Sequence, residues 1–239
     1  MFVPPVLRRH LPPLVLGIAA ITSVSVALQI LLAVPELWWI AAAFLGSAAL
    51  QGVGAWGLHR ERFWARGYAI GALLSGGVGA GSWFTSIGLM VPASLIAIVL
   101  LLADDAPGRF ERRRAFLELK TLDAAGARRL FYVGLGLGIG LPALLGSPLS
   151  VLLFAQAPIP ATIAAGLGAL GFLGLTRLAS WCYFAILGAV VSLGVAVVMC
   201  VLAYSEVAAA WGCFCLAALF VASLPLARPV LSHLLSRHE

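Results

Sequence analysis

Long apolar runs alternate with short polar clusters along the 239 residues of the chain. A membrane hydrocarbon core about 30 Å thick is crossed by roughly 20 apolar residues in a helix. Runs of about this length predict an all-α integral membrane protein with eight transmembrane helices. The predicted helices cover residues 11–34, 37–58, 64–85, 88–104, 129–147, 150–175, 180–204 and 207–226.

The third and fourth helices depend on how one apolar run is divided. Residues 67–103 are almost uninterrupted apolar sequence, which is too long for one ordinary helix and short for two. A single crossing would separate the arginines at 60–66 from those at 109–114, whereas two crossings place both groups on the same side of the membrane. A re-entrant hairpin over 67–103 places the charges equally well, so six full spans plus a hairpin is the alternative.

The distribution of charge predicts the orientation. With eight spans, all fifteen Lys and Arg residues lie on one side, and Glu36 and Glu206 lie on the other. Because cytoplasmic loops carry the excess of Lys and Arg in membrane proteins, we expect a multi-pass protein of a bacterial-type inner membrane with both termini in the cytoplasm.

Composition supports the membrane assignment. The chain is 62% hydrophobic and 10% charged, whereas a soluble domain is about half apolar and a quarter charged. The net charge of +6 comes from clusters between apolar runs rather than from one basic face, which argues against nucleic acid as a partner.

The sequence matches itself at an offset of 117 residues. A Gly-Leu-x-Arg-x3-Trp motif begins at Gly57 and again at Gly174, and nine of the 22 positions over residues 57–78 are identical to their counterparts. The matched charged and aromatic residues, expected at the inner face, are Arg60, Trp64, Arg177 and Trp181. The match predicts two tandem four-helix units, residues 1–104 and 129–239, which arose by duplication and have the same orientation.

A hydrophilic linker over residues 105–128 joins the predicted units. We expect it to be cytoplasmic, and its composition is compatible with an amphipathic helix at the membrane surface. Its basic residues are candidates for contact with anionic lipid or a protein partner: Arg109, Arg112, Arg113, Arg114 and Lys120. The alternative is a linker whose charges only set the topology.

Most tryptophans fall near the predicted helix ends, as in the aromatic belts of membrane proteins. We expect headgroup-level positions for Trp38, Trp39, Trp83 and Trp211 at the outer interface, and for Trp64 and Trp181 at the inner interface. Glycines four residues apart predict close helix packing at Gly67/Gly71, Gly77/Gly81, Gly134/Gly138 and Gly136/Gly140.

The predicted spans offer little chemistry. Intramembrane enzymes and ion pumps need ionisable groups inside the bilayer, and the sequence places none at mid-membrane. We therefore predict no catalytic, cofactor-binding or metal-binding residues, and the four cysteines are interpreted as small apolar residues. Gln29 and Gln51, on consecutive helices, are candidates for a polar path, the alternative being a simple interhelical hydrogen bond.

Two functional hypotheses follow. The first is a non-catalytic membrane subunit or scaffold of a larger, transport-related assembly, which docks partners at its basic cytoplasmic face. The second is a permease or facilitator for a neutral or lipid-like substrate, with the path between the two repeats. An enzyme is less favoured, because the sequence nominates no nucleophile with a base. Faces of small residues also allow packing against a second copy of the chain.

Overall fold

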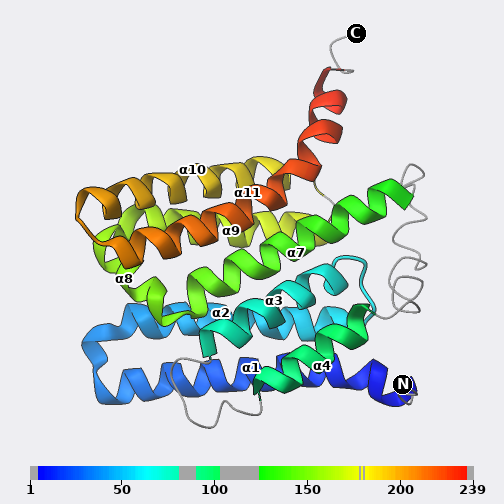
Figure 1. Cartoon of the computed structure of the whole chain (residues 1–239), viewed down its shortest axis with the longest axis horizontal. Coiled ribbons are helices and arrows are strands. Elements are labelled where there is room, and N and C mark those ends of the chain that lie inside the picture. Colours follow the sequence, from blue (N-terminus) through cyan, green and yellow to red (C-terminus); the bar gives the residue numbers. More distant parts are fainter. Residues whose placement is uncertain (1–4, 81–89, 103–123, 178, 180, 236–239) are drawn as a thin grey trace.

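The computed structural model of the chain describes residues 5–80, 90–102, 124–177, 179 and 181–235. Regular structure in these residues is entirely helical (Figure 1). The helices are α1 (Pro5–Ala33), α2 (Trp38–His59), α3 (Ala65–Ala80), α4 (Met90–Leu102), α7 (Ala124–Gly146), α8 (Pro148–Gln156), α9 (Pro158–Thr176), α10 (Trp181–Leu202) and α11 (Glu206–Leu235). A short 3-10 turn, η1 (Pro35–Leu37), connects α1 to α2.

Six segments in the described part of the chain are long and apolar enough to cross a membrane. They are Arg9–Ala33, Pro35–His59, Arg128–Gly146, Pro158–Thr176, Trp181–Leu202 and Glu206–Ala227. The architecture is thus all-α with six candidate spans, as expected of a multi-pass membrane protein.

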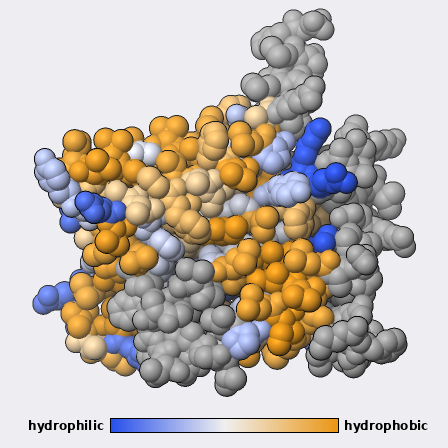
Figure 2. Space-filling view, in the orientation of Figure 1, coloured by the Kyte–Doolittle hydropathy of each residue, from blue (hydrophilic) through white to orange (hydrophobic). Residues whose placement is uncertain are grey.

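Apolar side chains cover much of the outside of the bundle. Leu32, Val99, Val191 and Leu202 are all more than half exposed. Figure 2 shows hydrophobic residues over the middle of the visible face and hydrophilic residues mainly towards its ends. A soluble monomer rarely exposes so large an apolar surface, whereas lipid chains cover such a surface in a membrane.

The predicted span 150–175 is wrong at its beginning. The chain forms two helices there, because α8 ends at Gln156 and α9 starts at Pro158. Ala157 between them has non-helical angles of φ −138° and ψ 61°. Proline disfavours the helical conformation in the residue before it, which explains the break. The candidate span is therefore α9 alone.

The last predicted span is too short. We expected a helix over 207–226 with Pro225 near its end, but α11 continues to Leu235. Figure 1 shows the last turns of α11 bending away from the bundle. A proline removes one helical hydrogen bond and often kinks a helix without ending it.

Helices α3 and α4 are short. Their 16 and 13 residues correspond to lengths of about 24 and 20 Å, less than the hydrocarbon thickness of about 30 Å. The two helices pack against each other, and α4 also packs against α1. Residues 81–89, between them, lie outside the described residues, so the described helices fit both two crossings and a hairpin.

Helix α7 lies at the centre of the bundle and uses glycine on two faces. Gly67 and Gly71 of α3 lie against the backbone of α7. A Cβ atom added at Gly71, for example, would be only 2.7 Å from the backbone nitrogen of Ile139. Gly134 and Gly138 of α7 face the backbone of α3 at Trp64 and Tyr68 in return. On the other face, Gly136 and Gly140 meet Ala218, Leu219 and Ala222 of α11. These contacts confirm three of the four predicted glycine pairs, while the side-chain surroundings of Gly77/Gly81 are outside the described part.

Candidate functional site

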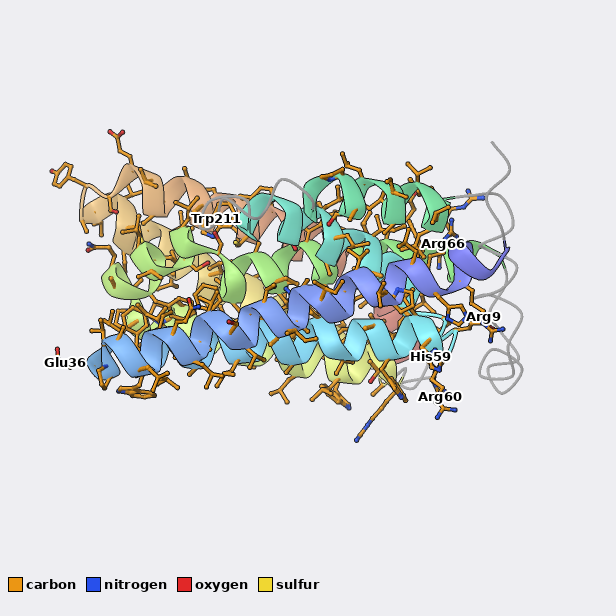
Figure 3. All side chains as sticks on the ribbon, turned by 90° about the horizontal axis from the view of Figure 1, so that it is seen from below. Arg9, Glu36, His59, Arg60, Arg66 and Trp211 are labelled. Atoms are coloured by element: carbon orange, nitrogen blue, oxygen red, sulfur yellow. The ribbon has the colours of Figure 1, made fainter. Side chains whose placement is uncertain are left out.

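Described charged side chains gather at the two ends of the bundle. Figure 3 shows Arg9, His59 and Arg60 at one end and Glu36 at the opposite end. We call the end that carries Arg9, His59 and Arg60 the basic end. An ion pair at this end joins α1 to the loop after α2. An Nη atom of Arg9 lies 3.7 Å from a carboxylate oxygen of Glu61. The labelled basic residues thus lie at the end opposite Glu36, and Glu61 lies among them in an ion pair.

Arg66, at the start of α3, contacts both α4 and α7 near the basic end. Its Nε–H donates a 2.8 Å hydrogen bond to the carbonyl of Leu101 in the last turn of α4. Its guanidinium also lies 5.0 Å from the centre of the Phe131 ring on α7. A cation at a helix C-terminus interacts favourably with the helix dipole and the open carbonyl groups. Because the start of α3 meets the end of α4, these two helices are antiparallel.

The two loops with the repeated motif share a helix-ending hydrogen bond. After α2 the amide of Arg62 donates to the carbonyl of Gly57 over 2.9 Å, and after α9 the amide of Ala179 donates to the carbonyl of Gly174 over 2.9 Å. Such a bond satisfies a carbonyl that a helix C-terminus leaves open. In the first loop Glu61 supplies the left-handed residue of this turn, with φ 52°. The helices before the two motif loops therefore end with the same backbone hydrogen bond.

The glycine of each motif packs against the indole ring of the tryptophan in the same motif. A Cβ at Gly57 would lie 2.5 Å from the Trp64 ring, and a Cβ at Gly174 would lie 3.0 Å from the Trp181 ring. A larger side chain at either position would displace the indole. This contact explains why glycine and tryptophan recur at the same spacing.

Trp64 lacks the exposure expected of a tryptophan at the headgroup level. Trp64 is only 2% exposed, whereas its counterpart Trp181 is 44% exposed and fits the prediction better. The Trp64 ring lies edge-on to Phe172 of α9, with ring centres 5.1 Å apart. Because α2 and α7 pack against α3 and Phe172 of α9 contacts the Trp64 ring, the tryptophan at the start of α3 faces protein rather than lipid headgroups.

Tyr68 and Phe172 extend this buried aromatic cluster, and sequence reasoning missed both. Their rings are stacked at 4.3 Å with an interplanar angle of 27°, and Tyr68 is fully buried. The cluster joins α3 to α9 and so connects helices from either side of the undescribed linker. Tyr68 follows Trp64 by one helical turn, and this spacing was the available signal in the sequence.

The structure separates the two glutamines of the predicted polar path. Gln29 is exposed on α1, while Gln51 is buried on α2. The Gln51 side chain contacts Ser23 of α1 and Ser47 of its own helix, each over 3.4 Å. Since Ser23 lies level with Gln51, Gln29 is six residues, or about 9 Å, further along α1. A polar cluster exists, but it consists of Gln51 with two serines.

A second polar contact was not anticipated from the sequence. The indole nitrogen of Trp211 on α11 donates a 3.1 Å hydrogen bond to Ser150 Oγ on α8, and this hydroxyl donates to the Ala143 carbonyl of α7 over 2.7 Å. Ser147 caps α8 by accepting from the amide of Leu149 over 3.2 Å. These bonds connect α8 to α7 and α11 and pair polar groups that are buried away from water.

The remaining predicted sites are placed as follows. Arg177 is exposed at the end of α9. All of the linker candidates lie outside the described residues, namely Arg109, Arg112, Arg113, Arg114 and Lys120. Cys182, Cys200 and Cys215 are buried, Cys213 is exposed, and all four are free thiols. The described residues contain no cluster of three His, Cys, Asp or Glu side chains.

Comparison with known proteins adds no relative. No family model, curated protein or solved structure matches the chain.

Proposed function

We propose that the chain is a non-catalytic membrane subunit or scaffold, which docks a partner of a larger assembly at its basic end. The observation that carries this proposal is the nature of the interior. In the part of the chain whose burial is described, the buried polar side chains are six serines and one glutamine, apart from aromatic residues such as Tyr68 and the thiols, and none of them is charged. The centre is filled by glycine contacts between α3 and α7 and by the aromatic cluster. Such an interior packs helices, and in its described part it holds no charged side chain and no group of three potential metal ligands.

The proposed topology has eight crossings, by α1, α2, α3, α4, α7, α9, α10 and α11, with the basic end in the cytoplasm of a bacterial-type cell. The antiparallel pair of α3 and α4 is compatible with it, because their contact at Arg66 returns the chain to the basic end, as a hairpin would also do. Equivalent loops after Gly57 and Gly174 support two tandem units of the same orientation. Residues 105–128 then form the cytoplasmic linker, where basic side chains meet anionic lipid or the partner.

Copurification tests the docking proposal. The tagged chain is purified from native membranes in mild detergent at low and high salt. We expect a partner that is retained at low salt and lost at high salt, because charge contacts at an exposed basic surface are screened by ions. Recovery of a lone chain at every salt concentration would contradict the scaffold.

A pair of matched variants locates the contact. Replacing Arg112, Arg113 and Arg114 by Gln removes three charges from the linker, and replacing Arg60, Arg62 and Arg177 by Gln removes three charges from the loops. We expect the linker variant to lose the partner and the loop variant to keep it. The reverse result would move the docking surface to the loops.

The second candidate, a facilitator for neutral or lipid-like molecules, is favoured by one observation. The polar cluster of Gln51, Ser23 and Ser47 lies where the first helices meet α7, since a Cβ at Gly146 would contact the Ser47 hydroxyl. Proteoliposome flux of glycerol and of a fluorescent short-chain phospholipid tests it. Transport that is lost in Gln51→Leu and kept in Gln29→Leu would favour the facilitator over the scaffold.

A further inference from the structure

Tyr68 carries a polar atom that its surroundings do not satisfy. Its side chain is fully buried, and its hydroxyl oxygen has no hydrogen-bond partner in the described structure. The ring lies against α2, because a Cβ at Gly54 would be 2.9 Å from Tyr68 Cε1. The hydroxyl is two bonds from that carbon and therefore lies close to α2. Buried hydroxyls in proteins are normally paired with protein or with ordered water.

Gln51 is a second under-satisfied group. An amide side chain can donate two and accept two hydrogen bonds. Gln51 Nε2 donates to Ser47 Oγ and Gln51 Oε1 accepts from Ser23 Oγ, both at 3.4 Å, which is long for such bonds. The single proton of Ser23 also has the Ala19 carbonyl at 3.0 Å. When it bonds to this closer acceptor, Gln51 Oε1 is left without a donor.

The two groups lie along one face of α2. Gln51 and Gly54 are three residues apart, so they occupy the same face and differ by about 4.5 Å along the helix axis. The Tyr68 ring and Gln51 therefore lie near neighbouring turns of α2, and Gln51 Oε1 has only the long contact from Ser23. An offset of this size along the helix can be bridged by one small hydrogen-bonding molecule.

The surroundings define what kind of molecule fits. Leu16 of α1 and Phe172 of α9 are buried beside Tyr68, and none of the buried side chains in the described part is charged. An ion at this place would lose its hydration without a counter-charge. An uncharged hydrogen-bonding molecule would satisfy both protein groups at little cost.

We propose that Tyr68 and Gln51 form a buried binding site for one small uncharged hydrogen-bonding molecule, of the size of water. The molecule accepts a hydrogen bond from the Tyr68 hydroxyl and donates one to Gln51 Oε1. This site is independent of the proposed docking function, because it lies inside the bundle and away from the basic linker.

Infrared spectroscopy reads the Tyr68 hydroxyl directly. The chain has four tyrosines, so a variant with Tyr132→Phe, Tyr183→Phe and Tyr204→Phe leaves Tyr68 as the only one. With ring-labelled tyrosine in a membrane film, and water as the probe, we expect the C–O stretch of a hydrogen-bonded phenol. Drying the film should shift the band to the free-phenol position, and rehydration should restore it.

Two glutamine variants complete the test. In the same background, Gln51→Leu should shift the Tyr68 band towards the free-phenol position in the hydrated film, whereas Gln29→Leu on the exposed face of α1 should leave it unchanged. A free-phenol band in the hydrated parent would overturn the proposal. A hydrogen-bonded band that stays unchanged on drying and in Gln51→Leu would also overturn the proposal, because the acceptor of the Tyr68 hydroxyl would then be a protein group.

Thermal unfolding in detergent gives a second, independent readout. If a bound molecule pairs with the hydroxyl, Tyr68→Phe loses that bond and lowers the midpoint by about 2–4 °C relative to Tyr132→Phe. If the hydroxyl is unpaired in the native protein, its removal raises the midpoint, and the binding site does not exist.

Discussion

The tryptophans of the two repeated motifs differ in how far they are buried. Between α2 and α3 the tryptophan is 2% exposed, and between α9 and α10 it is 44% exposed, although the glycine contact is the same. The cause lies in the helices that follow. α3 presents Gly67 to the backbone of α7, whereas α10 carries Phe184 at the corresponding position, and this side chain is 52% exposed.

This comparison separates what local sequence determines from what neighbouring helices determine. The Gly-Leu-x-Arg-x3-Trp motif specifies the chain reversal, because its hydrogen bonds lie within the loop. Burial of the tryptophan depends on whether the next helix lies at the centre of the bundle or at its edge. Residues related by the offset of 117 are therefore matched controls for each other.

Removing the two tryptophans should give the largest difference. Trp64→Ala leaves a cavity among α2, α3 and α9, and we expect it to lower the free energy of unfolding by about 3–5 kcal/mol. Trp181→Ala removes a half-exposed ring and should cost about 1 kcal/mol. Reversible unfolding in mixed detergent micelles measures both values, and equal losses would show that Trp64 is not enclosed.

Adding a methyl group at the two matched glycines should give the next largest difference. Gly71→Ala pushes a Cβ into the backbone of α7, which cannot move without parting the helices, so we expect a loss of about 3 kcal/mol. Gly188→Ala meets only the end of the flexible Leu167 side chain, 2.9 Å away, and should change the stability by less than about 0.5 kcal/mol. The same micelle assay applies. Tolerance of alanine at both positions would contradict the close contact of α3 and α7.

The matched serines should give the smallest difference. The single hydroxyl proton of Ser75 is shared between the carbonyl oxygens of Ala72 and Gly138, at 3.1 and 3.2 Å, and the second of these links α3 to α7. Interhelical bonds of this kind contribute about 0.6 kcal/mol in membrane proteins, so Ser75→Ala should cost about this amount. Ser192→Ala, at the corresponding position of α10, should have no measurable effect. A double-mutant cycle of Ser75→Ala with Gly71→Ala checks that both act through the same interface.

The sequence predicted the features that depend on local chemistry. Apolar runs gave the candidate spans, the Gly57 and Gly174 motifs gave two equivalent loops, and glycine pairs gave the faces of α7. The break before Pro158 also had a local signal, because two prolines, at 158 and 160, fall early in the predicted span. That signal was outweighed by the continuous apolar composition around it.

What the sequence could not predict is how each helix is turned towards its neighbours. In water, the apolar face of a helix identifies its buried side, but in a membrane the lipid-facing side is apolar as well. Trp64 was for this reason assigned to the headgroup level, and Gln29 was paired with Gln51 although it faces outwards. In the aromatic cluster, Phe172 lies more than 100 positions from Trp64 and Tyr68, and no local pattern connects it to them.

The central claim is that eight crossings return the chain to one basic side, and thiol accessibility in intact cells tests it most directly. In a chain with its four cysteines replaced by Ala, single cysteines are placed at Glu36, Ser86 and Glu206, and at Arg60 and Arg177. The account predicts that a membrane-impermeant maleimide labels the first three from outside, and the last two only after the cells are permeabilised. Labelling at 86 only after permeabilisation would make residues 67–103 a hairpin, and labelling of 36 and 60 from the same side would contradict the topology.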